Sequence, residues 1–318
     1  MRSTKHPKPP SLDAALQSAT AIIKDALAEP RLQPVVKAFF DTASNTICYV
    51  VHDPATLACA IIDSVLDFDT ATGKTSTRAA QQLIDYVSLH GLQTQWLLET
   101  HVHADHLSAA PWLQKRLGGR VAIGREIVQV QEVFGSVFNA EPGFARDGSQ
   151  FDRLFDDGAS FEMGALFTCV LAVPGHTPAC SAYIIGDAIF LGDTLLMPDY
   201  GSARCDFPGG SASQLYQSIQ RLFSLPDASR TFICHDYLAP GRESYAWESS
   251  IGAQKRANMH VRAGVTQAEF VAMRHARDAT LPMPKLLLPA VQVNMRAGQL
   301  PPPEDNGVRY LKLPLDQF

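Results

Sequence analysis

The sequence predicts an α+β protein in which two mixed β-sheets pack face to face, with helices outside and an accessory segment at the C-terminal end. Two sets of short apolar runs with strand character are each followed by a helical pattern, and this order is typical of two sheets covered by helices. The chain has 318 residues, of which 46% are hydrophobic, so it can bury a large core. Several strand-like runs end in histidine or aspartate, which predicts a cluster of polar side chains at one sheet edge.

The first half of the chain predicts a leader helix and then the first sheet. Between residues 11 and 28, apolar residues recur at helical spacing, which predicts an amphipathic helix. Residues 46–51 and 58–62 predict a β-hairpin around the turn at His52, and Asp63 ends the second strand near the polar edge. The remaining elements of this half are a helix over residues 75–90, a strand before residue 101, a helix over residues 109–117 and a short strand over residues 121–123.

The second half predicts another set of strands, a helix and a tail of different character. Strand-like runs recur between residues 161 and 190, with a hairpin turn at Gly186, and Ser211 can cap a helix over residues 211–225. The tail contains polar helical segments over residues 248–260 and 266–278 and a proline-rich run over residues 281–303. We therefore divide the chain into an N-terminal extension, a main domain and a cap packed on it, over residues 1–34, 35–243 and 244–318.

Charge and composition limit the partners that we expect. The formal net charge is −5, the isoelectric point is near 6.0 and no Lys/Arg-rich run is present, which argues against nucleic acid and favours a small-molecule substrate. No stretch approaches the roughly 18 apolar residues of a transmembrane helix, so no membrane partner is expected. The six cysteines are scattered, which is typical of buried free thiols in a reducing cytoplasm. A homodimer is the candidate assembly.

The strongest functional signal is the run Thr-His-Val-His-Ala-Asp-His over residues 100–106, which follows an apolar strand-like run. Three imidazoles and a carboxylate at this spacing are typical of a metal site. Alternate residues of a strand-end loop project in the same direction. We therefore expect His101 and His103 to chelate one ion, while Asp105 and His106 face a neighbouring position.

Three further candidate ligands each follow a strand-like run. His176 lies in a Pro-Gly-His turn that fixes the direction of the imidazole, Asp193 ends the apolar run over residues 188–192, and His235 follows another short run. A single histidine after a strand is commonly a hydrogen-bonded loop residue. The repeated position at strand ends, however, predicts that one sheet edge gathers all of these side chains.

This set of residues resembles the metallo-β-lactamase superfamily, whose fold is an αβ/βα sandwich with metals at one sheet edge. The resemblance is carried by the H-x-H-x-D-H motif at residues 101–106, followed in order by His176, Asp193 and His235. It implies that residues 35–243 form a metallo-β-lactamase-like catalytic domain. One scaffold of this kind hosts many chemistries, so the reaction needs finer features.

Finer features resemble the persulfide dioxygenases, also called sulfur dioxygenases, and their bacterial β-lactamase-like relatives. They are the metal loop Glu99–Ser108, an R-x-D-F element at Arg204–Phe207, the segment His235–Tyr237 and an N-M-R-x-G element at Asn294–Gly298. Glyoxalase II shares the sandwich and the ligands but lacks the R-x-D-F and N-M-R-x-G pair. The sequence departs from the family at Leu191, where some members carry Thr, and in the loop Met197–Tyr200.

The persulfide dioxygenase resemblance implies one Fe(II) per chain, held by His101, His176 and Asp193. Two imidazoles and a carboxylate on one face leave positions open for a sulfur substrate and O₂. The side chains around this iron are then His103, Asp105, His106 and His235. The implied reaction oxidises glutathione persulfide with O₂ and water to sulfite and glutathione, as part of sulfide detoxification and sulfur metabolism.

Three residues are candidates for substrate binding under the same resemblance. Arg204 can hold the glutathione moiety, or it can anchor its own loop through Asp206. Tyr237 can donate a hydrogen bond to the substrate or pack beside the metal, and Arg296 can contact the substrate from the tail or serve the structure.

Two other interpretations remain open. A dinuclear zinc thioesterase of the glyoxalase II kind would use the same side chains for two ions: His101, His103, His176 and Asp193 for one, and Asp105, His106, His235 and Asp193 for the other. A sensor or binding module with a structural ion is the third interpretation. Structural zinc sites are usually closed and rich in thiolates, whereas this ligand pattern contains no Cys. Metal content separates the three interpretations, as one iron, two zincs or a single inert zinc.

Overall fold

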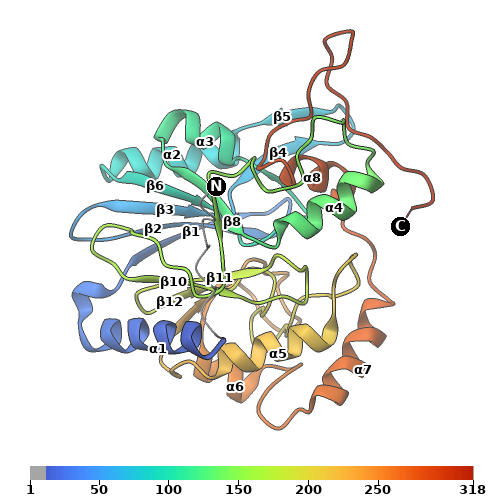
Figure 1. Ribbon diagram of the computed structural model, residues 1–318. Coiled ribbons are helices and arrows are strands. Elements are labelled where there is room, and N and C mark those ends of the chain that lie inside the picture. Colours follow the sequence, from blue (N-terminus) through green and yellow to red (C-terminus); the bar gives the residue numbers. More distant parts are fainter. Residues whose placement is uncertain (1–11, 318) are drawn as a thin grey trace, which may run out of the picture.

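Two β-sheets pack face to face in the computed structural model, which describes residues 12–317 (Figure 1). The first sheet has the strand order β1 (Val35–Asp41), β2 (Thr46–His52), β3 (Ala58–Ile62), β6 (Gln93–Leu98), β8 (Arg120–Gly124) and β9 (Arg153–Phe155). The second has the order β10 (Thr168–Ala172), β11 (Ser181–Ile185), β12 (Ala188–Phe190), β13 (Arg230–Phe232) and β14 (Glu248–Ser250). A small third sheet has the order β5 (Lys74–Ser76), β4 (Val65–Asp69) and β7 (Leu107–Ser108). Residues 1–11 of the predicted N-terminal extension lie outside the described part of the chain.

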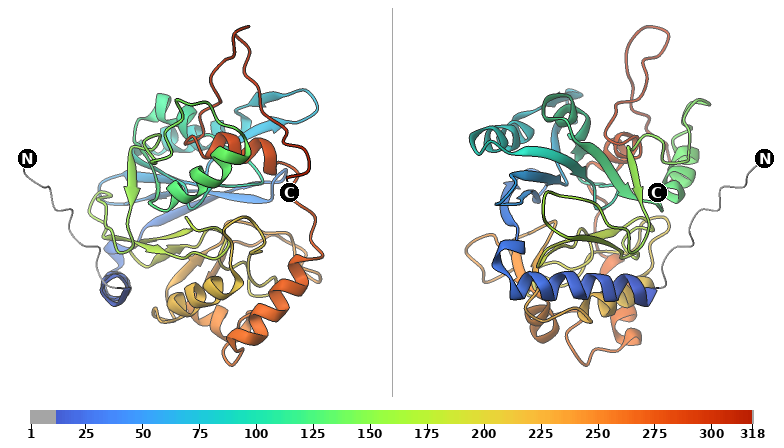
Figure 2. Two further views of the ribbon diagram at one scale, coloured as in Figure 1. Left: turned by 45° about the vertical axis from the view of Figure 1, so that its right-hand side comes forward. Right: turned by 60° about the vertical axis from the view of Figure 1, so that its left-hand side comes forward.

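Helices cover the outer faces of both sheets (Figures 1 and 2). The helices over the first sheet are α2 (Arg78–Leu89), α3 (Ala110–Leu117) and α4 (Ile127–Val137), and those over the second are α1 (Leu12–Ala28), α5 (Ala212–Phe223) and α6 (Ile251–Ala257). A short 3₁₀ helix, η1 (Pro30–Leu32), leads from α1 to β1; α7 (Gln267–Asp278) packs beside α5, and α8 (Leu287–Asn294) packs on β7. The predicted sandwich of two mixed sheets with helices outside is thus confirmed. Among the described residues, no helix combines the length and the apolar character needed to span a lipid bilayer.

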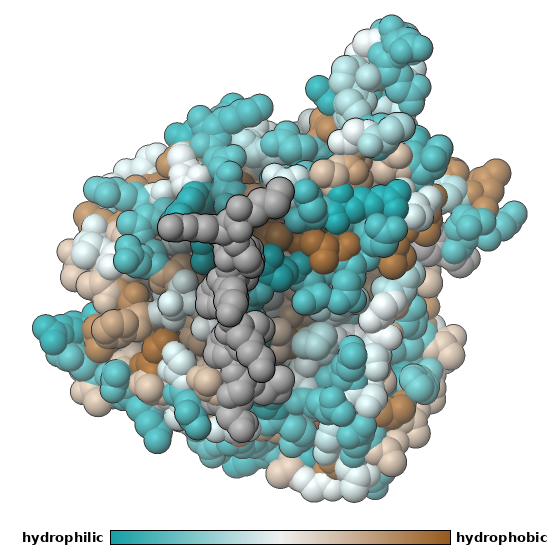
Figure 3. All heavy atoms as spheres, viewed as in Figure 1, coloured by the Kyte–Doolittle hydropathy of each residue, from teal (hydrophilic) through white to brown (hydrophobic). Residues whose placement is uncertain are grey.

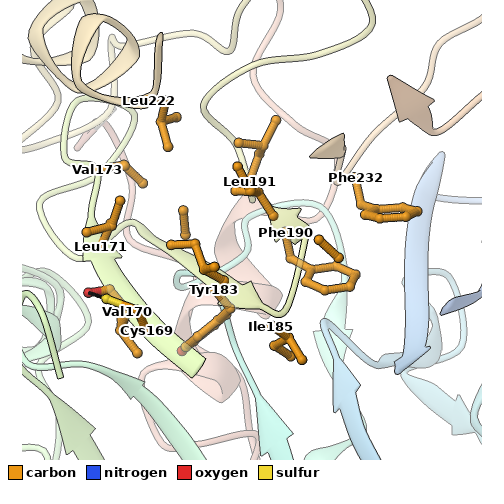
Figure 4. Packing of buried hydrophobic residues seen from close by; sticks show 14 of the residues in the cluster. Cys169, Val170, Leu171, Val173, Tyr183, Ile185, Phe190, Leu191, Leu222 and Phe232 are labelled. Atoms are coloured by element: carbon orange, nitrogen blue, oxygen red, sulfur yellow. Dashed lines mark hydrogen bonds between the residues drawn. The ribbon is translucent and has the colours of Figure 1, made fainter. Parts of the chain in front are cut away.

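The core between the sheets explains why the central strands are apolar on both faces. Every residue of β2, β3, β11 and β12 is buried, as expected for strands with protein on either side. The rings of Phe190 and Phe232 stack with centroids 5.1 Å apart (Figure 4), and Tyr49 of the first sheet packs edge-on against both. Across the same interface, the hydroxyl of Tyr183 donates to the carbonyl of Glu99 at 2.8 Å. The two sheets are therefore fixed to each other close to the metal loop Glu99–Ser108.

The tail differs from its predicted structure in two places. The helix expected over residues 248–260 begins as strand β14, which pairs with β13, because Ser250 is extended and its hydroxyl caps α6 by accepting from Ala253 N. The proline-rich run contains α8, since Pro289 lies in the first turn of that helix, where a missing N–H does no harm. The C-terminal part therefore adds a strand to the second sheet and a helix that packs on β7 of the small third sheet.

Two other predicted elements are shorter than expected. The helix predicted from residue 75 begins at Arg78, because residues 74–76 pair with β4 as an edge strand. The run from residue 161 becomes a strand only at Thr168, because the chain first turns at Gly164, which has a φ of +60°.

Residues after α8 form an extended arm that projects from the body (Figures 1 and 2). The side chain of Gln292 ties the arm down, because its amide donates to the carbonyl of Lys312 at 2.9 Å and accepts from the amide of Lys312 at 2.8 Å. On the face seen in Figure 3, hydrophilic side chains predominate and hydrophobic ones are scattered, as is usual for a protein surface.

Candidate metal centre

The loops that carry the candidate ligands meet because of two parallel strand pairs. β3 and β6 are parallel, so Asp63 and the metal loop leave the first sheet at the same edge, where Asp63 N donates to Leu98 O at 2.9 Å. β12 and β13 are also parallel, which brings Asp193 and His235 to the corresponding edge of the second sheet. A β-bridge between Thr46 and His235 joins the two edges. All seven predicted ligand residues lie in this one region.

His101, His176 and Asp193 form one compact group. The ring Nε2 atoms of His101 and His176 lie 3.9 and 3.5 Å from Oδ2 of Asp193, and the three ligand atoms lie within 4.8 Å of one another. Both imidazoles are almost fully buried. Burial, with smaller contributions from neighbouring histidines, holds the pKa of His101 well below its ordinary value, so the ring is neutral and suited to a metal.

Hydrogen bonds to the other ring nitrogen select the tautomer of each imidazole. Nδ1 of His176 donates to the carbonyl of Arg204 at 2.8 Å, which leaves Nε2 free for an ion. Nδ1 of His101 lies 3.0 Å from the hydroxyl of Thr100, and this hydroxyl in turn donates to Asp63 at 2.8 Å, so it accepts from the imidazole. Both rings therefore present Nε2 to Asp193.

Asp105, His106 and His235 form a second group beside the first. Nε2 of His235 lies 3.7 Å from Oδ1 of Asp105 and 3.5 Å from Oδ1 of Asp193, so Asp193 presents one oxygen to each group. Nδ1 of His106 lies 3.1 Å from Asp105, which leaves its Nε2 free. Burial alone would raise the pKa of Asp105, but His235 and His106 hold it well below the ordinary range, and the carboxylate is ionised.

His103 lies behind these groups, between two buried carboxylates. Its Nε2 lies 2.9 Å from Asp63 and 3.6 Å from Glu99. Burial alone would lower the pKa of His103, but the two carboxylates raise it to about 9, while burial raises the pKa of Glu99 to about 8. The sequence placed Asp63 near this edge but missed Glu99 as a partner; its spacing of four residues from His103 was the available signal.

Unpaired buried atoms test whether these residues fit a metal ion. Among the described residues, Nδ1 of His103, Nε2 of His106 and Oδ1 of Asp193 are buried and have no hydrogen-bond partner. Buried polar atoms are normally paired, so three such atoms in one cluster fit a site built for cations. Cys234 is also close, but its thiol donates to Oδ2 of Asp63 at 3.6 Å and is therefore already paired. The donors are thus nitrogen and oxygen atoms, which suit iron or zinc.

The turn that carries His176 requires a glycine. Gly175 has a φ of +146°, and a Cβ at this position would lie 2.4 Å from the backbone N and Cα of Leu215 in α5. Only a residue without a side chain lets α5 approach the turn so closely. The Pro-Gly-His pattern therefore sets both the direction of the imidazole and the position of a helix.

A cavity of about 880 Å³ opens over the ligand cluster. Asp105, His106, His176, Asp193 and His235 all reach its lining, whereas His101 and His103 are buried beneath. The other walls come from the β4–β5 hairpin, the loop over residues 196–207 and residues 281–286. The basic residues of the lining are Lys74, Arg204, Arg274, Arg277 and Lys285.

The three substrate-binding candidates occupy different positions. Arg204 lines the cavity, but its guanidinium forms two hydrogen bonds with Asp206, at 2.6 and 2.7 Å, and a third with the carbonyl of Pro282. Tyr237 also lines the cavity and stacks on His235, with ring centroids 5.8 Å apart. Arg296 does not reach this lining in the described structure, because Glu141 holds its guanidinium through hydrogen bonds of 2.6 and 2.7 Å.

The two departures from the family pattern have separate effects. Leu191 is completely buried in the core, so its side chain does not reach the ligands. The loop Met197–Tyr200 closes in a turn, where Tyr200 N donates to Met197 O at 2.8 Å, and it brings Tyr200 to the cavity wall.

Known proteins share this fold and much of this sequence. A probable metallo-hydrolase of Burkholderia pseudomallei is 57% identical over 291 residues, covering 88% of this chain and 99% of that protein. The mitochondrial persulfide dioxygenase ETHE1 of Homo sapiens is 28% identical, covering 83% of this chain and 89% of that protein. The crystal structure of ETHE1 from Myxococcus xanthus superposes with a TM-score of 0.66 at 32% identity, covering 83% of this chain and 100% of that one. Residues 48–235, more than half of the chain, match the metallo-β-lactamase superfamily, and the chain therefore belongs to that superfamily.

Proposed function

We propose that this protein is a persulfide dioxygenase with one ferrous ion per chain. The reaction is glutathione persulfide plus O₂ plus water, giving glutathione, sulfite and two protons. The observation that carries the proposal is the compact face of His101, His176 and Asp193, of which His176 and Asp193 reach the cavity. Similarity to ETHE1 over most of both chains supports the same assignment.

This face suits non-haem iron chemistry. A ferrous ion held by two imidazoles and one carboxylate supplies open positions for O₂ and a sulfur anion, together with the electrons that activate O₂. The chain's own residues prepare the face: the carbonyl of Arg204 and the hydroxyl of Thr100 fix the imidazole tautomers, and the sheets exclude water from behind.

The cavity also suits an anionic thiol carrier. Glutathione persulfide carries two carboxylates and a persulfide anion, whereas the chain has a net charge of −5, so local cations must offset the repulsion. Arg204 and Arg274 are ion-paired with Asp206 and Asp278. Lys74, Arg277 and Lys285 form no ion pair with any described residue, and we assign them to the carboxylates of the carrier.

Metal content and oxygen uptake test the proposal together. After anaerobic purification, we expect one iron per chain by elemental analysis, and O₂ consumption with sulfite release when glutathione persulfide is added. Asp193→Ala should lose both iron and activity, because Asp193 is the anionic ligand of the face, while His103→Ala should keep most of the iron. Two zincs per chain, one of them lost in His103→Ala, would contradict the assignment.

A second candidate function is hydrolysis of glutathione thioesters by two zinc ions. Asp193 favours this candidate, because its two carboxylate oxygens lie near different histidines, Oδ2 near His176 and Oδ1 near His235. The unpaired nitrogens of His103 and His106 also favour it, since one of them is available to each of the two ions. The Burkholderia relative is named as a metallo-hydrolase, which agrees with this candidate. Rapid hydrolysis of S-lactoylglutathione without oxygen uptake, measured on the same preparation, would favour the hydrolase.

A further inference from the structure

The C-terminal helix α8 reaches the metal loop through one side chain. Asn294, the last residue of α8, is 5% exposed and lies against the loop backbone. Its Nδ2 donates to the carbonyls of His103 and His106 at 2.9 and 2.8 Å, and its Oδ1 accepts from the amide of Ser108 at 2.8 Å. We infer that Asn294 is a positioning residue, which holds the metal loop in the geometry that its ligands require.

The chemistry of the amide matches the need of the loop. Residues 99–106 form no strand or helix, so their carbonyls lack the partners that regular structure would supply. A primary amide offers two donor hydrogens and an acceptor oxygen, which fit two carbonyls and one N–H. The two carbonyls belong to His103 and His106, whose rings carry unpaired nitrogens. Movement of either carbonyl would move the loop that also carries His101, a ligand in both metal assignments, so the clamp acts on the metal through the backbone.

Neighbouring contacts hold Asn294 itself in place. Ala290 and Val293 of α8 pack with Leu107 in a small apolar cluster. Beyond the helix, Arg296 is paired with Glu141, and a Cβ on Gly298 would lie 3.0 Å from the carbonyl of Ser108, so this approach requires glycine. The N-M-R-x-G element is therefore one unit: Asn294 binds the metal loop, and Arg296 and Gly298 hold the backbone that follows Asn294 against the rest of the protein.

This inference goes beyond the proposed function, because it concerns the geometry of the ligands and holds for either metal. Asn294 lies outside residues 48–235, the segment that matches the superfamily, so the tail completes a site whose ligands all lie in that segment. Metal binding, measured with a spectroscopic probe, therefore tests this inference without depending on which reaction the protein catalyses.

Cobalt(II) is the probe, because its visible absorption reports the number and arrangement of its ligands. Asn294→Asp keeps the size and the acceptor oxygen but removes both N–H donors. We expect the affinity for cobalt(II) to fall by about tenfold to a hundredfold, as is usual when a partner behind metal ligands is lost, and the visible bands to shift. Affinity is measured by titration of the metal-free full chain.

A matched control comes from the same helix. Gln292→Glu is the same change of amide to acid at a buried position, and it removes donations to the carbonyls of Leu288 and Lys312 instead of the metal loop. We expect this variant to unfold at lower denaturant concentration while it binds cobalt(II) as the wild type does. If Asn294→Asp does not yield folded protein, Asn294→Ser is measured in the same way. Wild-type affinity and spectrum in the folded Asn294 variant, or equal weakening in the Gln292 control, would overturn the inference.

Discussion

At the scale of single residues, the candidate site is a set of donors whose orientation is set by their partners. His101 and His176 present Nε2 because a hydroxyl and a carbonyl occupy Nδ1, and Asp193 serves two groups because its two oxygens face opposite sides. The residue types and the order of these ligands were predictable from the sequence. Their partners were not, because a hydrogen bond such as that from His176 to the carbonyl of Arg204 depends on a loop 28 residues away.

The cavity cations give the first prediction at this scale. Replacing Lys74 and Lys285 together by Gln removes two of the cations that we assign to the carrier, so KM for glutathione persulfide should rise about tenfold with kcat unchanged. Steady-state kinetics at fixed ionic strength measures this. Lys115→Gln, on the exposed surface of α3, is the control and should change neither constant. An unchanged KM in the double variant would show that Lys74 and Lys285 do not bind the substrate.

Arg204 gives a prediction that separates two roles. Because its guanidinium is held by Asp206, Arg204→Lys and Asp206→Asn break the same pair, and each should lower the free energy of unfolding by about 1 kcal/mol. Urea denaturation measures this, and KM should stay near the wild-type value in both. If Arg204→Lys raises KM while Asp206→Asn does not, Arg204 contacts the substrate in addition to anchoring its loop.

At the scale of elements, helix α7 supports the wall of the cavity. The guanidinium of Arg274 is 1% exposed, donates to Asp278 and also donates to the carbonyl of Ser202 at 3.0 Å. The second oxygen of Asp278 accepts from the amide of Cys205 at 3.0 Å. The loop between these contacts carries the carbonyl that orients His176. α7 thus connects to the metal ligands through the backbone of this loop.

Removal of this buried pair should be costly. Arg274→Met leaves the carboxylate of Asp278 buried without its cation, so the free energy of unfolding should fall by about 3 to 5 kcal/mol. Arg277→Met is the control on the same helix, and because Arg277 forms no ion pair with any described residue, it should change stability by less than about 0.5 kcal/mol. Chemical denaturation of both variants measures the free energy of unfolding. A similar decrease in the two variants would show that α7 tolerates neither change, rather than that the Arg274–Asp278 pair is costly to break.

The elements themselves were predicted well where they depend on local pattern. The β2–β3 hairpin, α3 and the Ser211 cap of α5 follow from apolar spacing and a capping hydroxyl. The helix α8 was missed because its proline obscured the pattern, and strand β14 was missed because an edge strand depends on its neighbour. The role of Asn294 was equally hidden, since its partner Ser108 is 186 residues away.

At the scale of the whole molecule, one buried histidine gives stability a dependence on pH. Burial, with Arg274 and Arg277 nearby, lowers the pKa of His260 from 6.5 to about 4. Its Nδ1 accepts from the amide of Ser202 at 3.0 Å, so the folded state needs the neutral ring. The unfolded chain takes up this proton near pH 6.5 and the folded chain only near pH 4. The contribution of the neutral His260 ring to the free energy of unfolding is therefore complete above pH 6.5. It is lost as the pH falls from 6.5 to about 4.

Between pH 6.5 and pH 4, protonation of His260 should lower the free energy of unfolding by up to about 3 kcal/mol. His260→Gln should lower stability at neutral pH but show a flatter dependence in this range, measured by denaturation at a series of pH values. The difference between the two proteins isolates His260 from the other buried histidines. If the NMR signals assigned to the His260 ring titrate near pH 6.5 in the folded wild type, the prediction is contradicted.

The contact between Asn294 and the metal loop also has a consequence during protein synthesis. A ribosome makes His106 188 residues before it makes Asn294, so the loop exists for most of translation without its clamp. Until α8 emerges, the carbonyls of His103 and His106 lack the Asn294 amide that binds them in the folded protein. We therefore expect a chain that is interrupted before α8 to carry every candidate ligand but to bind metal more weakly than the full chain. On this expectation, tight binding of the ion follows the synthesis of α8.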